Sequence, residues 1–166
     1  LYAILLNSAN DAAIVLAEAV AGSEWKFVQM MNQRAREIGA KGTKFSNASG
    51  LPSPKISQHT TAYDMYMIFR HALNFDFFKQ AIRQPYKQIT TLGGRKISLK
   101  SHNKILFKKD WHKKVYGKTG YTRAAQSCFV GTIQKGNATL IIAVFGCSRR
   151  WDDIRLIFRK YGGIAL

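Results

Sequence analysis

The sequence predicts an α+β domain in which helices come first, antiparallel strands follow, and one helix closes the chain. Three observations support this fold class. Apolar side chains recur at helical spacing up to about residue 84, β-rich segments flank Gly-containing turns after that point, and residues 151–161 return to helical spacing. We find no linker, repeat or low-complexity segment. We therefore expect one domain over residues 1–166, with a helical part at about 1–84 and a sheet-forming part at about 85–166.

Residues with short polar side chains mark the expected starts of three helices, because such side chains accept hydrogen bonds from free backbone N–H groups. These candidate caps are Asn10 with Asp11, Ser23, and Thr60 or Thr61. Gly22 and Gly39 follow the first two apolar segments, where glycine commonly ends a helix. The Gly- and Pro-containing residues 41–60 predict a long irregular loop, and the Phe-rich residues 75–82 predict a short helix.

Two β-hairpins are expected after Pro85. Residues 87–100 alternate in polarity around a Gly-Gly pair, which is typical of two strands joined by a turn. Residues 127–134 and 138–146 are rich in β-branched and aromatic side chains and flank a Gly-Asn pair. The second hairpin and the apolar C-terminal segment then predict antiparallel strands followed by a closing helix.

The chain is strongly basic, with 26 Lys and Arg residues, 9 Asp and Glu residues and a formal net charge of +17. Such a charge attracts polyanions. The cations occur as scattered pairs such as Lys108-Lys109 and do not form the long run of a nucleic-acid-binding arm. We therefore expect no nucleic-acid partner, and two interpretations stay open: a solvated basic surface, and affinity for an anionic membrane or cell-wall surface.

The two cysteines, Cys128 and Cys147, do not form a C-x-x-C motif and have no nearby histidine, so we expect no metal site and no other cofactor. They are compatible with one disulfide or with two buried thiols, and buried thiols are favoured.

Two short motifs carry the chemistry of this sequence. Ser8-Ala9-Asn10 matches the pattern S-x-N, and Lys118-Thr119-Gly120 matches K-T-G. Either triplet alone arises often by chance. Here they occur in order, one at a helix junction and the other just before a hairpin, as do the second and third motifs of active-serine penicillin-recognising enzymes.

The similarity extends over most of the chain. The matching segments are residues 5–13, 21–32, 47–52, 61–65, 116–122 and 150–153. On these residues the sequence resembles the low-molecular-mass penicillin-binding proteins, which are serine-type D-alanyl-D-alanine carboxypeptidases. The resemblance implies a β-lactamase-like fold and acyl-enzyme chemistry on peptidoglycan stem peptides ending in D-Ala-D-Ala. It also implies inhibition by penicillins and other β-lactams, and a location outside the cytoplasm.

The resemblance assigns roles to seven residues. The catalytic candidates are Ser8, Asn10 and Lys118, and the substrate-binding candidates are Thr119, Gly120, Tyr121 and Arg150. By analogy, the Ser8 hydroxyl relays a proton to the leaving D-alanine and Lys118 supplies positive charge near the substrate carboxylate. The adjacent Arg149 is an alternative to Arg150. The histidines at positions 59, 71, 102 and 112 are assigned no catalytic role.

One departure from the family concerns its first motif, S-x-x-K, which precedes S-x-N by some tens of residues. Only seven residues precede Ser8. The pattern occurs at Ser23–Lys26 and at Ser101–Lys104, but both matches follow S-x-N, which is the wrong order. We therefore expect that the N-terminal part of the domain, with the nucleophilic serine and its lysine, is missing from the chain, and that the chain alone is inactive.

Two rival functions are weighed against a carboxypeptidase. A class A β-lactamase needs a glutamate, usually within E-x-x-L-N, that activates the deacylating water. The three glutamates are Glu18, Glu24 and Glu37, and none lies in such a motif, so this rival is disfavoured. A non-catalytic peptidoglycan-binding relative stays open, as does the choice between carboxypeptidase and endopeptidase activity.

Overall fold

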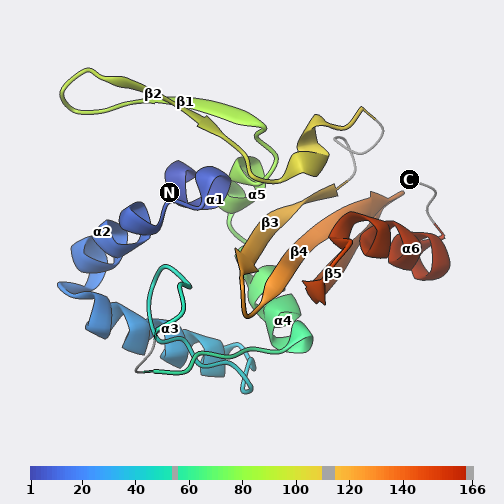
Figure 1. Ribbon diagram of the computed structural model, residues 1–166, viewed down its shortest axis with the longest axis horizontal. Helices are drawn as coiled ribbons and strands as arrows, with labels where there is room; N and C mark the ends of the chain where they lie inside the picture. Colours follow the sequence, from blue (N-terminus) through green and yellow to red (C-terminus); the bar gives the residue numbers. More distant parts are fainter. Residues whose placement is uncertain (54–55, 110–114, 164–166) are drawn as a thin grey trace.

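The computed structural model describes residues 1–53, 56–109 and 115–163 (Figure 1). It confirms the α+β class, with helices first, then antiparallel strands and a closing helix. The helices before the first strand are α1 (Tyr2–Asn7), α2 (Asn10–Ala21), α3 (Glu24–Glu37), α4 (Ala62–Ala72) and α5 (Asp76–Ala81). The later elements are β1 (Tyr86–Thr90), β2 (Lys96–Lys100), the 3-10 helix η1 (Lys104–Phe107), β3 (Val115–Thr122), β4 (Gln126–Lys135), β5 (Ala138–Cys147) and α6 (Arg150–Gly162).

Two of the expected helix caps are confirmed and one is wrong. The Ser23 hydroxyl accepts a hydrogen bond from the backbone N–H of Lys26, and the Thr61 hydroxyl accepts one from that of Asp64. Asn10, by contrast, is the first residue of α2 and not its cap, because Ala9 holds the cap position and makes no side-chain cap bond. The Asn10 side chain is thereby left available for another role.

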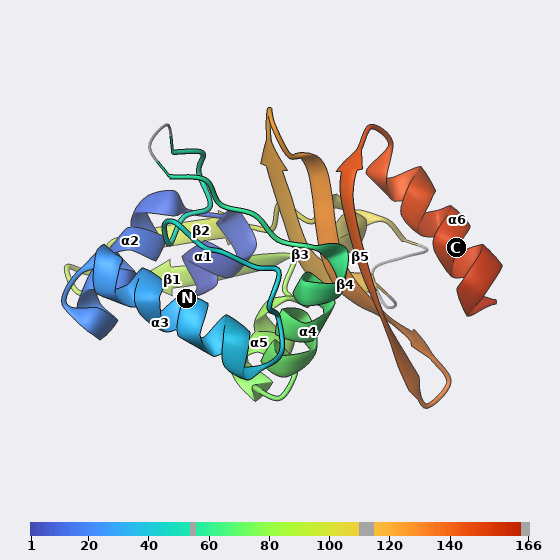
Figure 2. The same ribbon diagram turned by 90° about the horizontal axis from the view of Figure 1, so that it is seen from below.

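A three-stranded antiparallel sheet in the order β3-β4-β5 separates two helical layers. Helix α6 covers one face of this sheet, and α4 lies against the other face (Figures 1 and 2). Successive side chains of a strand point to opposite faces. Phe129 and Ile133 therefore pack towards Ile154 and Phe158 of α6, whereas Val130 packs towards Phe69 of α4. Full burial of one such side chain contributes roughly 1.5–3 kcal/mol.

Strands β3 and β4 approach each other closely at Gly117 and Gly131, which lie directly opposite in the ladder. A Cβ atom on either glycine would overlap a backbone carbonyl of the other strand and the Phe129 ring. The ring therefore occupies the space that two side chains would otherwise fill. This packing fixes the position of the K-T-G segment, which continues β3 directly after Gly117.

Strands β1 and β2 form a separate hairpin that projects from the body of the molecule (Figure 1). Its base is tied to α1, because the His102 backbone N–H donates to the Leu6 carbonyl oxygen over 2.9 Å. This bond brings the residues that follow β2 next to the junction of α1 and α2. Among the described helices, none has the length and apolar character needed to span a membrane.

Replacing Gly131 with alanine should lower the free energy of unfolding by about 1–3 kcal/mol, because the new methyl group overpacks the β3–β4 contact. Urea denaturation of the purified protein measures this change. Gly93→Ala is the matched control, since a Cβ there meets nothing within 4 Å. Equal stability of the two variants would show that the close approach of the strands is not a constraint.

Candidate active site

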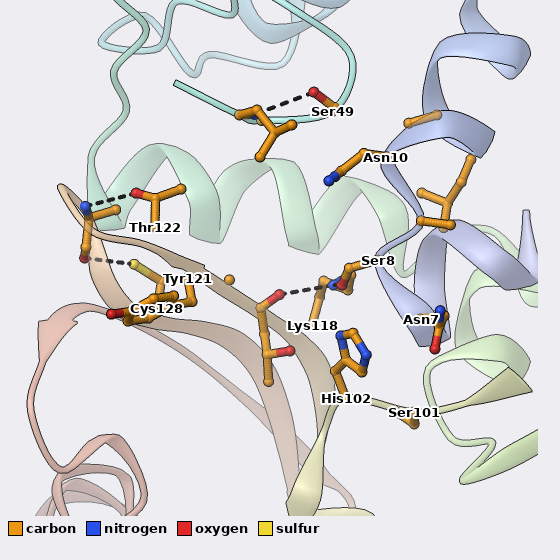
Figure 3. A pocket seen from close by; sticks show the side chains of 18 of the residues that line it. Asn7, Ser8, Asn10, Ser49, Ser101, His102, Lys118, Tyr121, Thr122 and Cys128 are labelled. Carbon is orange, nitrogen blue, oxygen red and sulfur yellow. Dashed lines mark hydrogen bonds between the residues drawn. The ribbon is translucent and has the colours of Figure 1, made fainter. Parts of the chain in front are cut away.

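An open cleft with a volume of about 1110 Å³ lies between the α1–α2 junction and the edge strand β3 (Figure 3). Its other walls come from residues 48–51 and from the segment after β2. All seven residues that the sequence singled out line this cleft, although they come from both ends of the chain. They are Ser8, Asn10, Lys118, Thr119, Gly120, Tyr121 and Arg150.

Ser8 lies at the turn between α1 and α2 with φ 52° and ψ 42°, in the left-handed region that residues other than glycine seldom adopt. The turn is held by the Ala9 N–H, which donates to the Ala3 carbonyl oxygen over 3.2 Å. Strained backbone of this kind is concentrated at functional sites. Figure 3 shows the Ser8 and Asn10 side chains at the cleft, and among the described residues the Asn10 amide has no hydrogen-bond partner.

Lys118 reaches across the cleft from β3. Its ammonium group donates to the Ser8 hydroxyl oxygen and, over 2.9 Å, to the Thr119 carbonyl oxygen. Burial, aided by the positive charge of Arg150, lowers the pKa of Lys118 to about 8. At neutral pH the group is therefore mostly charged, yet it releases a proton far more readily than an exposed lysine does. A lysine of this kind can both hold an anion and take part in proton transfer.

Thr119, Gly120 and Tyr121 follow Lys118 on β3, which is an edge strand because it pairs only with β4 in its sheet. The unpaired side of an edge strand offers N–H and C=O groups to an extended peptide. Tyr121 is 67% exposed, and a Cβ on Gly120 would meet only the Cys128 side chain at an ordinary 3.6 Å. Within the described residues, the outer edge of this strand is therefore open for a ligand.

Arg150 begins α6 and extends behind the K-T-G segment. Its guanidinium donates to the carbonyl oxygens of Cys128 over 2.7 Å and Gly120 over 3.2 Å, and it lies over the Trp151 ring at 4.5 Å. Burial lowers its pKa, and its Nε atom has no hydrogen-bond partner among the described residues. Arg150, and not Arg149, lines the cleft. Arg150 thus braces β3 and adds positive charge to the site.

The two S-x-x-K matches differ in position. Ser23 caps α3 and does not line the cleft. Ser101 and Lys104 do line it, but the buried Ser101 hydroxyl accepts a hydrogen bond from the Asn103 N–H over 3.2 Å. No hydrogen bond between Ser101 and Lys104 is found in the described part of the chain. Within the described residues, neither serine hydroxyl is therefore bonded to the side-chain ammonium group of the lysine in its own motif; Ser23 accepts only the backbone N–H of Lys26.

The expectation of two buried thiols is wrong. Cys128 and Cys147 are free thiols, and both are partly exposed. They lie near the open end of β4 and β5, where the register shifts between Ser127 and Phe129. Burial, together with the neighbouring Asp153 carboxylate, raises the pKa of the Cys147 thiol. Cys128 is one of the residues that line the cleft.

Part of the cleft wall could not be predicted from the sequence. His102 lines the cleft near Lys118 (Figure 3), although no sequence pattern distinguishes it from the other three histidines. His112 lies outside the described residues. The segment 48–51 belongs to a stretch that resembles the family, but only the structure brings it to the cleft. Contacts between segments so far apart in the chain leave no signal in a single sequence.

The chain is similar to known proteins over nearly its whole length. Residues 1–149 match the peptidase S11 family model, described as D-alanyl-D-alanine carboxypeptidase. The sequence is 33% identical to D-alanyl-D-alanine carboxypeptidase DacF of Bacillus subtilis over 149 residues, which are 89% of this chain and 37% of that protein. It therefore spans well under half the length of this relative.

Solved structures agree with this match. A crystal structure of D-alanyl-D-alanine carboxypeptidase from Mycobacterium tuberculosis superimposes with a TM-score of 0.87 and 31% identity, over 98% of this chain and 62% of that one. Penicillin-binding protein D2 of Listeria monocytogenes, in its cefotaxime-bound form, gives a TM-score of 0.80 and 29% identity, over 95% and 63% of the two chains.

The lowered pKa of Lys118 predicts how stability depends on pH. Below pH 8 the lysine is charged in both the folded and the unfolded protein, so the cost of burying the charge is fully present. Between pH 8 and about 10.5 the folded protein releases the proton while the unfolded chain holds it, and stability rises. Relative to Lys118→Met, the wild type should therefore gain unfolding free energy from pH 7 to pH 10 in urea denaturation. An equal difference at both pH values would contradict the lowered pKa.

Proposed function

Because this chain belongs to the D-alanyl-D-alanine carboxypeptidase family, we propose that its protein removes the terminal D-alanine from peptidoglycan stem peptides. The reaction proceeds through an acyl-enzyme on a serine and is blocked by β-lactams. The similar penicillin-binding protein D2 of Listeria monocytogenes has been crystallised with the β-lactam cefotaxime bound, which supports inhibition by β-lactams.

The hydrogen bond between Lys118 and Ser8 is the observation that carries this proposal. Acyl transfer to a serine needs a base for the nucleophile and a proton for the leaving amine. A hydroxyl both donates and accepts, and the neighbouring lysine has a pKa of about 8, so this pair can pass a proton. In the proposed reaction the Ser8 hydroxyl delivers that proton to the nitrogen of the departing D-alanine.

The other cleft residues bind the substrate. The terminal carboxylate lies against the Lys118 charge and the Thr119 hydroxyl, and the stem peptide extends along the open edge of β3. The Tyr121 N–H is one donor to the oxyanion that forms at the attacked carbonyl. The Asn10 amide, which is free in the described structure, holds the peptide group of the substrate.

In this proposal the acylated serine and its lysine come from a part of the protein outside these 166 residues. The reason is geometric. Ser23 lies outside the cleft. Ser101 is buried, and its hydroxyl already accepts a hydrogen bond from the Asn103 N–H. The lysine that contacts Ser8 is Lys118, which belongs to the K-T-G motif. Ser8 is therefore assigned to proton transfer and not to attack.

A class A β-lactamase is less well supported by the cleft. Hydrolysis of the penicilloyl-enzyme in that class requires a carboxylate that activates water. No Asp or Glu is among the described residues that line the cleft. Glu24 instead accepts a hydrogen bond from the Ala48 N–H, and Glu37 pairs with Arg34 on the surface of α3. The absence of a carboxylate in this wall favours slow release of a bound β-lactam.

Replacing Lys118 with alanine in the full-length protein should slow acylation by a fluorescent penicillin about a hundredfold or more, because the proton path and the positive charge are both lost. Lys26→Ala is the matched control, since Lys26 lies on α3 away from the cleft. Unchanged labelling of Lys118→Ala with an unchanged melting temperature would remove Lys118 from the site. Peptide mapping of the label on Ser8, Ser23 or Ser101 would contradict an acylated serine outside this chain.

The proposed substrate also places the protein outside the cytoplasmic membrane, because peptidoglycan stem peptides are trimmed there. We expect the complete reading frame to encode a signal sequence or a membrane anchor, and cell fractionation to recover the protein with the envelope. Recovery of the mature protein in the cytoplasm would argue against a cell-wall substrate.

A further inference from the structure

A second cavity of about 580 Å³ lies between α3 and the described residues 41–46, Ile56 and His59, and shares no lining residue with the cleft. We call it the α3 pocket. Its volume is within the range of small-ligand sites. The irregular loop after α3 contributes to both cavities, since Lys44 to Ser46 line the α3 pocket and Ala48 to Leu51 line the cleft. Figure 2 shows the described part of this loop passing alongside α3 before the chain enters α4 beside the sheet.

The α3 pocket is strongly basic. Arg36, Lys41 and Lys44 line it, all three are exposed, and none forms an ion pair within the described part of the chain. The one carboxylate in its wall, Glu24, already accepts the Ala48 N–H over 2.9 Å. Three unpaired cations around one hollow therefore favour an anionic ligand.

The pocket also presents an aromatic face. Trp25, in the first turn of α3, lines it and is 70% exposed. A tryptophan is usually well buried, so this exposure needs a reason. The apolar C–H face of a sugar ring packs well on an indole ring, and the neighbouring Gln29 amide can bond hydroxyl groups. An exposed indole ring in the same pocket as three cationic side chains therefore favours a sugar that bears an acidic group.

The wall opposite α3 is held in place before any ligand binds. The Asn32 side chain makes two hydrogen bonds to the backbone of Phe45, of 3.0 Å and 2.8 Å. Lys44 and His59 form an antiparallel bridge with bonds of 2.9 Å and 3.1 Å. A preformed wall lowers the entropic cost of binding.

We propose that the α3 pocket binds an acidic saccharide polymer, that is, a sugar or polyol chain carrying carboxylate or phosphate groups. We assign this polymer to the glycan strand of peptidoglycan, and this assignment rests on the proposed function. The loop that lines both cavities would then hold the glycan strand while one of its stem peptides enters the cleft. A phosphodiester polymer of the cell wall has the same recognition chemistry and is the other source to be distinguished.

Isothermal titration of the full-length protein tests the site with two probes. One is glycan strands stripped of stem peptides by an amidase, which keep one lactyl carboxylate on each muramyl residue, and the other is a soluble polyol-phosphate polymer. The variants are Trp25→Ala and the double variant Lys41→Gln/Lys44→Gln. The control is Arg95→Gln/Lys96→Gln, which removes the same charge from the exposed β1–β2 hairpin.

Both pocket variants should weaken binding of one probe at least tenfold, and the probe affected identifies the source. The hairpin control should change binding less than twofold. Equal weakening by the control would mean general charge attraction and would overturn the site. Equally tight, Trp25-dependent binding of random duplex DNA would overturn the saccharide assignment.

Failure of this site and failure of the proposed function give different results. Neither pocket variant alters a residue of the cleft, so acylation by fluorescent penicillin should keep its wild-type rate. Normal acylation without binding of either polymer would reject the α3 pocket alone. Polymer binding that depends on Trp25, in a protein that no penicillin labels, would reject the enzyme and keep the binding site.

Discussion

The contact between the Lys118 ammonium and the Ser8 hydroxyl joins residues 110 positions apart and depends on most of the structure. Ser8 is presented by a left-handed turn between two helices, and Lys118 is presented by the edge strand of the sheet. Burying a lysine is unfavourable, as the lowered pKa of Lys118 records. The sheet that presents Lys118 is held on both faces, because α6 and α4 pack against β4 and β5, and β3 is held in turn by its ladder with β4.

The sheet and the charge distribution act together around the cleft. Gly117 and Gly131 let β3 and β4 approach closely beneath the Phe129 ring, and Phe129 in turn meets Trp151 of α6 edge to face, with ring centroids 5.4 Å apart. The start of α6 is thereby fixed, and Arg150 reaches the carbonyl groups of the K-T-G segment. The packing of one aromatic pair thus sets where a second positive charge lies relative to Lys118.

The structure shows where part of the excess positive charge lies, which the composition could not: cationic side chains line both cavities. In the described part of the chain, no carboxylate lines the cleft and one carboxylate, already hydrogen-bonded, lines the α3 pocket. Both cavities therefore favour anions, and the loop that separates them contributes to both walls. A polymer that carries acidic groups at intervals could place one group in the cleft and another in the α3 pocket. A small, uncharged ligand could not do so.

The sequence by itself determined that helices precede antiparallel strands, the two hairpins and, through its resemblance to the family, six of the seven candidate residues, because capping, periodicity and the S-x-N and K-T-G triplets are local features. It did not determine the start of α2, where Asn10 is helical and its side chain faces the cleft, or the exposure of Cys128 and Cys147. It could not choose between Arg149 and Arg150, or place His102 and residues 48–51. Most of those outcomes depend on which segments, distant from one another in the sequence, pack side by side, and only the tertiary structure specifies that packing.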